Sequence, residues 1–169
     1  MGPHAIALVG IGNPLAGDDG VGPEVLRLVQ ARRCGDERLL FLPLESDLFS
    51  LADHLDRAEH FVFLDAIAGD DPGAIRISRA YQRAFAASLH QTDLGAVMQS
   101  LQALGLPNPF PTWEVWGIVI QPPQAFRVGL SPGIAQAASR LAESLNEHLS
   151  FLLDDTRPSH ELTSFCRPA

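Results

Sequence analysis

Acidic residues stand at two points of the sequence where they could bind a metal ion or act as a general base. Asp18 and Asp19 follow the apolar run 5–10 after a glycine-rich loop, and Asp65 stands near the end of the apolar run 60–67. Both runs have the length and composition of buried strands. A carboxylate that closes a buried strand must be paired or functional, because an isolated buried charge is very unfavourable. Such carboxylates bind divalent cations or accept protons during hydrolysis.

The glycine-rich loop over residues 10–22 predicts a cation site and not a phosphate site. It begins like a dinucleotide-binding fingerprint, but leucine stands where the third glycine is required. In a P-loop interpretation Gly12 and Gly17 have the right spacing, yet Asp18 occupies the lysine position. Adjacent carboxylates would repel a phosphate. A simpler alternative is that Asp18 or Asp19 caps the following helix, where acidic residues are favoured, while the other has a functional role.

The alternation of apolar runs with amphipathic segments predicts the elements that must position these carboxylates. The expected strands are residues 5–10, 39–44, 60–67, 74–78 and 114–120. The expected helices are residues 21–33, a segment opened by Ser46 or Asp47 that carries Leu48, Leu51, Ala52 and Leu55, a segment opened by Thr92 or Asp93 that ends at Gly105, and a segment that follows the Ser131–Pro132 cap and reaches Leu149. Because only a turn separates the third and fourth strands, we expect these two to be antiparallel neighbours.

Strands that alternate with helices indicate an α/β fold. We expect a single domain over residues 1–153, built on a twisted, mostly parallel five-stranded sheet with helices on both faces, and a flexible tail over residues 154–169. In such sheets ligands bind where loops leave the C-terminal ends of the strands. Both acidic positions belong to this edge.

The composition excludes several classes of function. The 169-residue chain has a formal net charge of −8 and contains no lysine. It therefore has no Schiff-base lysine, Ser–Lys dyad or P-loop lysine. The acidic balance disfavours nucleic acid as a partner, and no apolar run approaches the roughly 20 residues that a membrane span requires. With only two cysteines, Cys34 and Cys166, we expect no disulfide framework and a cytoplasmic protein.

Several segments together resemble the nickel–iron hydrogenase maturation proteases, and they follow the family's order and approximate spacing over residues 5–150. They are residues 10–22 (GIGNPLAGDDGVG), 63–66 (FLDA), 88–91 (SLHQ), 117–122 (GIVIQP) and 129–132 (GLSP). The resemblance implies a twisted sheet between helices. It also implies an endopeptidase that removes a C-terminal peptide from a nickel-loaded hydrogenase large-subunit precursor.

The resemblance further implies a set of site residues. The family's metal-binding groups match Asp19, Asp65 and His90, whereas Asp18 orients the loop or caps the helix. The metal is nickel supplied by the substrate, so the isolated protein is expected to be metal-free. The same three residues are the expected catalytic residues, with Asp19 or Asp65 as a possible general base. Two carboxylates and one imidazole suit divalent first-row metals, but this set alone does not select nickel.

The sequence departs from the family pattern at two places. Some members carry glutamate where Asp19 stands, and the shorter side chain implies a wider site or a closer loop. Some also carry a glycine pair after the second strand, where this chain has residues 43–47 (PLESD). That second departure bears on which hydrogenase is the substrate.

Two other functions remain as alternatives. The first is a non-catalytic nickel-binding chaperone module that uses the same three ligands. The second is an enzyme similar to the peptidyl-tRNA hydrolases, which share the opening of residues 10–14 (GIGNP) but continue with a histidine–asparagine pair. For the protease we expect the large-subunit precursor as partner, no nucleic acid or membrane, and a monomer or weak dimer.

Overall fold

The protein is organised around a five-stranded sheet with the order β2-β1-β3-β5-β4. The computed structural model describes residues 4–44, 48–79, 94–105, 107, 109–121 and 126–155. The strands are β1 (His4–Ile11), β2 (Leu39–Leu44), β3 (Ala58–Ala68), β4 (Ile75–Arg79) and β5 (Thr112–Ile120). All neighbouring pairs are parallel except β4 and β5. The predicted α/β fold with a mostly parallel sheet is confirmed.

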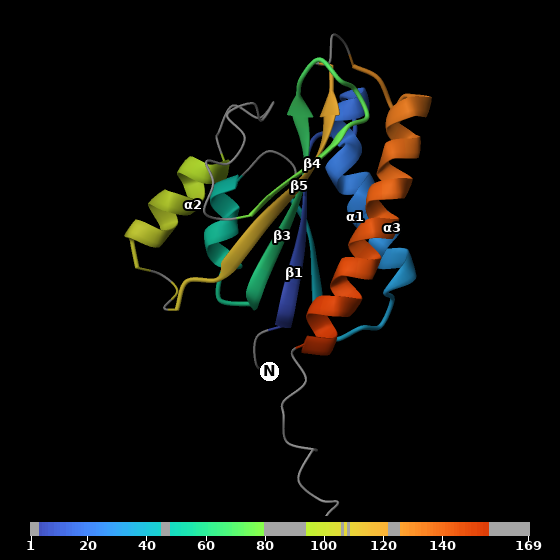
Figure 1. The fold of residues 1–169 in the computed structure, drawn as a ribbon. Helices are drawn as coiled ribbons and strands as arrows, with labels where there is room; N and C mark the ends of the chain where they lie inside the picture. The colour runs from blue at the N-terminus through green and yellow to red at the C-terminus, as the bar shows by residue number, and fades with distance from the viewer. Residues whose placement is uncertain are drawn as a thin grey trace, which may run out of the picture.

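Helices cover both faces of this sheet, as the sequence predicted (Figure 1). The helices α1 (Val21–Arg32) and α3 (Pro132–Asp155) pack on one face. The helix α2 (Leu94–Ala103) and the short 3-10 helix η2 (Leu48–Asp53) pack on the other. The residues proposed to open η2 (Ser46 or Asp47) and α2 (Thr92 or Asp93) all lie outside the described residues. In the part of the chain that the structure describes, no helix has the length and apolar character to cross a membrane.

The predicted pairing of the third and fourth strands is wrong, because β5 lies between them. β5 pairs in parallel with β3, and β4 pairs antiparallel with the other side of β5. The connection from β3 to β4 passes the end of β5, where Gly73 donates its N–H to the Val119 carbonyl oxygen at 2.8 Å. β3 is almost entirely buried and needs a partner on each side, whereas the half-exposed β4 suits a sheet edge.

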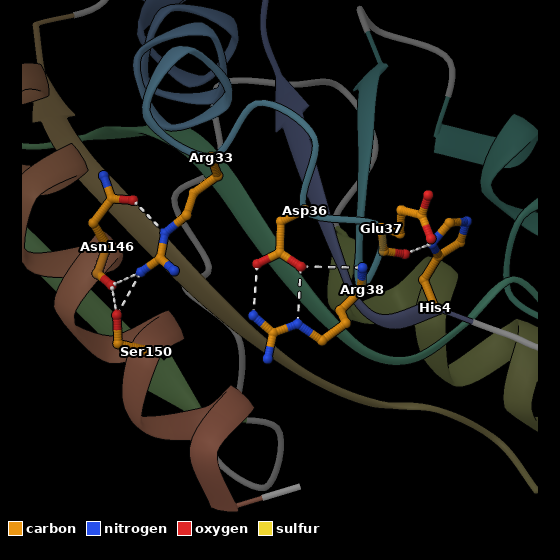
Figure 2. Close-up of polar contacts among 7 residues, drawn as sticks. All are labelled: His4, Arg33, Asp36, Glu37, Arg38, Asn146 and Ser150. Atoms are coloured by element: carbon orange, nitrogen blue, oxygen red, sulfur yellow. Dashed lines mark hydrogen bonds and ion pairs between the residues drawn. The ribbon is translucent and has the colours of Figure 1, made fainter. Parts of the chain in front are cut away.

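Polar side chains connect the C-terminal end of α1 to α3 (Figure 2). Arg33 donates from Nε to Asn146 Oδ1 at 2.9 Å, and its terminal nitrogen donates to the Asn146 carbonyl and, at 2.6 Å, to Ser150 Oγ. In the following turn, the Arg38 guanidinium binds the Asp36 carboxylate at 2.8 and 2.9 Å. These contacts hold one end of α1 beside α3 and close the connection from α1 to β2.

The other end of α1 lies directly against two parallel strands. A β-carbon at Gly22 would lie 2.2 Å from the carbonyl oxygen of Ile11 and 2.3 Å from that of Leu64. Nearby, Gly12 has a φ of 136°, and a β-carbon there would lie 2.1 Å from the Asp19 carbonyl oxygen. Only glycine fits these places, so the loop between β1 and α1 has one position over the sheet edge.

We predict that Gly22→Ala lowers the free energy of unfolding by about 2 kcal/mol or more, because the added methyl group meets backbone oxygens that cannot move independently. Gly133→Ala is the matched control, since Gly133 is also the second residue of its helix and a β-carbon there would meet nothing within 4 Å. That control should raise the free energy of unfolding by up to about 1 kcal/mol. Urea unfolding measures both, and equal effects would contradict the close-packing explanation.

Candidate functional site

The two predicted carboxylate positions lie at the same edge of the sheet, at the C-terminal ends of adjacent parallel strands. Asp19 lies in the 3-10 turn η1 (Gly17–Gly20) between β1 and α1, and this turn contacts β3. Asp65 follows Leu64 in β3, and Leu64 pairs with Gly10 near the end of β1. The structure therefore brings together residues that are far apart in the sequence, at the edge where α/β sheets bind ligands.

Both carboxylates are buried, and each accepts a hydrogen bond from a backbone amide. Asp19 is 7% exposed, and its Oδ2 accepts the N–H of Asn13 at 2.8 Å. Asp65 is 5% exposed, and its Oδ1 accepts the N–H of Ala66 at 2.7 Å. Backbone donors offset part of the unfavourable burial of a carboxylate and hold it in one orientation. A metal ligand or a general base needs such an orientation.

Asp65 points toward the face of the sheet that α2 covers. Phe61 and Phe63 belong to the apolar cluster on that face, and alternate residues of a strand share a face. His90, the third predicted ligand, precedes the first residue of α2 by four positions in the sequence and lies outside the described residues. Among the described residues, no group of three or more histidine, cysteine, aspartate or glutamate side chains could hold a metal ion.

Asp18 binds the N-terminus of the last helix and not that of the first. Its Oδ1 accepts the backbone N–H of Ser131 at 2.6 Å, and its Oδ2 accepts the Ser131 hydroxyl at 2.9 Å. Ser131 directly precedes α3, and its carbonyl accepts the first helical N–H, from Ala135, at 2.8 Å. The N-cap of α1 is Gly20, with no side-chain cap. The prediction that one of the adjacent aspartates caps the first helix is therefore wrong, and Asp18 instead binds Ser131, the residue before α3, a contact that the sequence did not indicate.

A cavity of about 490 Å³ borders the loop that carries these aspartates, between α1 and the segment that leads into α3. It is lined mainly by glycines and apolar side chains, and by the ion pair of Arg27 with Glu24 at 2.7 Å. The lining residues from the two segments are Pro14, Gly17, Gly20, Pro23, Val128, Gly129, Leu130 and Ala135, besides that ion pair. This space has room for an apolar side chain beside the loop, although Asp18, Asp19 and Asp65 are not among the lining residues.

Sequence reasoning missed a third buried carboxylate, which lies where β5 begins, away from the edge of Asp19 and Asp65. Glu114 is 4% exposed, and its Oε1 accepts the indole N–H of Trp116 at 2.9 Å. The same oxygen lies 2.9 Å from Nε2 of His148 and 3.8 Å from Nε2 of His60. The available signal was strand alternation, because Glu114 shares the inward face of β5 with the core residue Trp116.

These contacts lower the pKa of the Glu114 carboxyl below its ordinary value. Burial by itself would raise this pKa, but the interaction with His60, the hydrogen bond from Trp116 and the charge of His148 together outweigh it. The cluster joins β3, β5 and α3, and it borders a cavity of about 440 Å³. Trp116 and His148 both hydrogen-bond the Glu114 carboxylate, which indicates a structural role.

Comparisons with known proteins support the fold. No profile of a protein family and no curated protein matches the sequence. Among solved structures, the chain is similar to the [NiFe] hydrogenase maturation protease HybD from Thermococcus kodakarensis, with a TM-score of 0.71 and 22% identity over 85% of this chain and 98% of that one. For the hydrogenase maturating endopeptidase HybD from E. coli, the TM-score is 0.69 and the identity 23%, over 90% and 94% of the two chains.

A third similar structure is the [NiFe] hydrogenase maturation protease HycI from Thermococcus kodakarensis KOD1. Its TM-score is 0.65 and its identity 25%, over 88% of this chain and 94% of that one. The resemblance first seen in short motifs is therefore confirmed at the level of the fold, over most of the chain.

We predict that the Glu114 contacts stabilise the fold at neutral pH and are lost in acid. The folded pKa of Glu114 lies below its unfolded value, so this contribution is fully present above the unfolded pKa of about 4.3 and disappears as the pH falls through the folded value. Glu114→Gln should therefore reduce the loss of unfolding free energy between neutral and acidic pH. Urea unfolding at a series of pH values measures it, and identical pH profiles for both proteins would contradict the assignment.

Proposed function

We propose that this protein is an endopeptidase that removes a C-terminal peptide from a nickel-loaded hydrogenase large-subunit precursor. The observation that carries the proposal is the pair of buried carboxylates, Asp19 and Asp65, at one edge of a sheet whose fold is shared with hydrogenase maturation proteases. The motif that contains Asp19 and the strand end that contains Asp65 are also the segments that carry the sequence resemblance.

In this proposal Asp19, Asp65 and His90 bind the nickel ion that arrives with the precursor. Asp65 points toward the face covered by α2, and His90 stands shortly before α2 in the sequence, which is compatible with a shared ligand set. Carboxylate oxygens and an imidazole nitrogen are suitable donors for a divalent first-row metal. Only a precursor that contains nickel would complete the coordination, so the enzyme would distinguish loaded from empty precursors.

The proposed reaction is hydrolysis of one peptide bond. Nickel supplies a Lewis acid that can polarise the scissile carbonyl. A carboxylate oxygen of Asp19 or Asp65 takes a proton from water as the water oxygen bonds to the carbonyl carbon. The carbon–nitrogen bond then breaks, and that proton passes to the departing amine. Burial of both aspartates favours this chemistry, because electrostatic effects are stronger away from bulk water.

The precursor is the proposed partner, and we expect neither nucleic acid nor a membrane to take part, since the formal net charge is −8. We also propose that processing takes place in the cytoplasm. A monomer or weak dimer remains the expected state. The exposed apolar side chains of Leu15 and Val128 near the aspartate loop are suitable for contact with a protein substrate.

Precursor processing tests the proposal directly. The protein should cleave a nickel-loaded large-subunit precursor and leave a nickel-free one intact, as measured by mass spectrometry. Asp65→Asn and His90→Ala should abolish cleavage with little change in thermal midpoint, because each removes a ligand and no core packing. Asp56→Asn and His54→Ala are matched controls, since both residues lie in the turn before β3 at the opposite edge. Nickel-dependent binding of the precursor without cleavage would instead favour the chaperone function.

We further predict that the isolated protein holds little or no tightly bound metal. The proposed ligands include two oxygen donors and no thiolate, so borderline metals should bind weakly. An occupied site could also not report whether the substrate contains nickel. Elemental analysis of protein purified without added metal checks this, and Asp19→Asn should weaken the binding of added nickel. A stoichiometric ion that survives dialysis against a chelator would contradict the prediction and indicate a resident metal.

A further inference from the structure

Hydrogen bonds join the loop that carries the aspartates to the segment that leads into α3. The backbone of Arg127 donates to the Leu15 carbonyl at 3.1 Å and accepts the N–H of Gly17 at 2.6 Å. Further along, the Asp18 carboxylate accepts both the N–H and the hydroxyl of Ser131, at 2.6 and 2.9 Å. The loop is therefore joined to this segment by backbone hydrogen bonds at Arg127 and by the Asp18 side chain at Ser131.

Adjacent aspartates thus have different environments. Both oxygens of Asp18 are engaged with Ser131, at the N-terminus of a long helix where a negative charge is favoured. Asp19 is turned toward the backbone of Asn13, in the loop that follows β1. A carboxylate that uses both oxygens in such a contact is a poor candidate for a metal ligand or general base, but it can fix the turn to which it belongs.

We propose that Asp18 and Ser131 form a positioning pair that holds the turn η1 against α3 and thereby sets the direction of the Asp19 carboxylate. The turn η1 has only four residues and no side-chain cap, and so short a 3-10 helix depends on outside contacts for its conformation. The consequence for metal recognition rests on the proposed function, because it takes Asp19 as a ligand. The positioning itself can be measured without activity.

Substitutions at Asp18 separate positioning from a role of the charge. In Asp18→Asn the amide oxygen can accept the Ser131 N–H, and the amide nitrogen can donate to the Ser131 hydroxyl oxygen. This variant keeps the contact and removes the charge, whereas Asp18→Ala removes both. Ser131→Ala removes the hydroxyl and leaves the backbone donor, so its effect should be intermediate.

The first measurement is the affinity of the protein for added nickel(II), by calorimetry or NMR titration. We expect Asp18→Asn to stay within about threefold of the wild type and Asp18→Ala to bind about tenfold or more weakly. Asp18→Ala already removes the contact between Asp18 and Ser131, so adding Ser131→Ala removes nothing further. The double variant should therefore bind nickel no more than about twofold more weakly than Asp18→Ala alone. A loss in Asp18→Asn equal to that in Asp18→Ala would show that the charge matters and overturn the positioning role.

The second measurement is amide hydrogen exchange at Asn13, whose N–H donates to Asp19 Oδ2. Asp18→Ala should speed this exchange about tenfold or more, Asp18→Asn should leave it protected, and amides in the middle of β3 should be unchanged in both. If the isolated wild type binds no added nickel, precursor cleavage still tests the proposed function, and the Asn13 exchange alone decides the positioning. Unchanged exchange in Asp18→Ala would overturn the proposal. If that variant does not fold, faster Asn13 exchange in Ser131→Ala supports it and unchanged exchange overturns it.

Discussion

At Gly22, the first turn of α1 lies so close to the carbonyl oxygens of Ile11 and Leu64 that a β-carbon would not fit. This contact determines how far α1 enters over the ends of β1 and β3, and the remaining parts of the candidate site depend on it. The turn η1 directly precedes α1, so its place follows from that of the helix. The carboxylate of Asp19 is thereby buried at the edge of the sheet where the pairing of β3 with β1 ends at Leu64, next to Asp65.

The two groups of buried carboxylates differ in the donors that they use. Asp19 and Asp65 accept hydrogen bonds from backbone amides in the loop or strand beside them. Glu114 instead contacts the side chains of Trp116, His148 and His60, which come from three different elements. The side-chain contacts of Glu114 link α3 to the sheet. The backbone contacts of Asp19 and Asp65 orient each carboxylate at the edge where α/β sheets bind ligands. Only the first group lies at the ligand-binding edge of the sheet, and chemistry is assigned to it for that reason.

The motifs that carry the family resemblance and that the structure describes meet at one edge of the sheet, whereas residues 88–91 lie outside the described residues. The first motif contains Gly22 and both adjacent aspartates, and the last contains Ser131, which binds Asp18. A middle motif supplies the part of β5 that pairs with Asp65 and the residues after it. Their joint presence therefore has a physical explanation in this protein, because each supplies one side of the same loop and sheet edge. The fold shared with proteins at 22% and 23% identity agrees with this.

The sequence by itself determined the α/β class, the approximate bounds of the strands and the edge at which Asp19 and Asp65 lie. These features follow from the periodicity of apolar residues and from the position of polar residues at strand ends, both of which are local properties of the chain. The tertiary structure decided the place of β4, which is paired with β5 because the buried β3 requires a long partner on each side. It also decided the partner of Asp18, which lies 113 positions away, and the two histidines that lie beside Glu114. Contacts between distant residues depend on how the elements pack, and no local pattern of residue types encodes that packing.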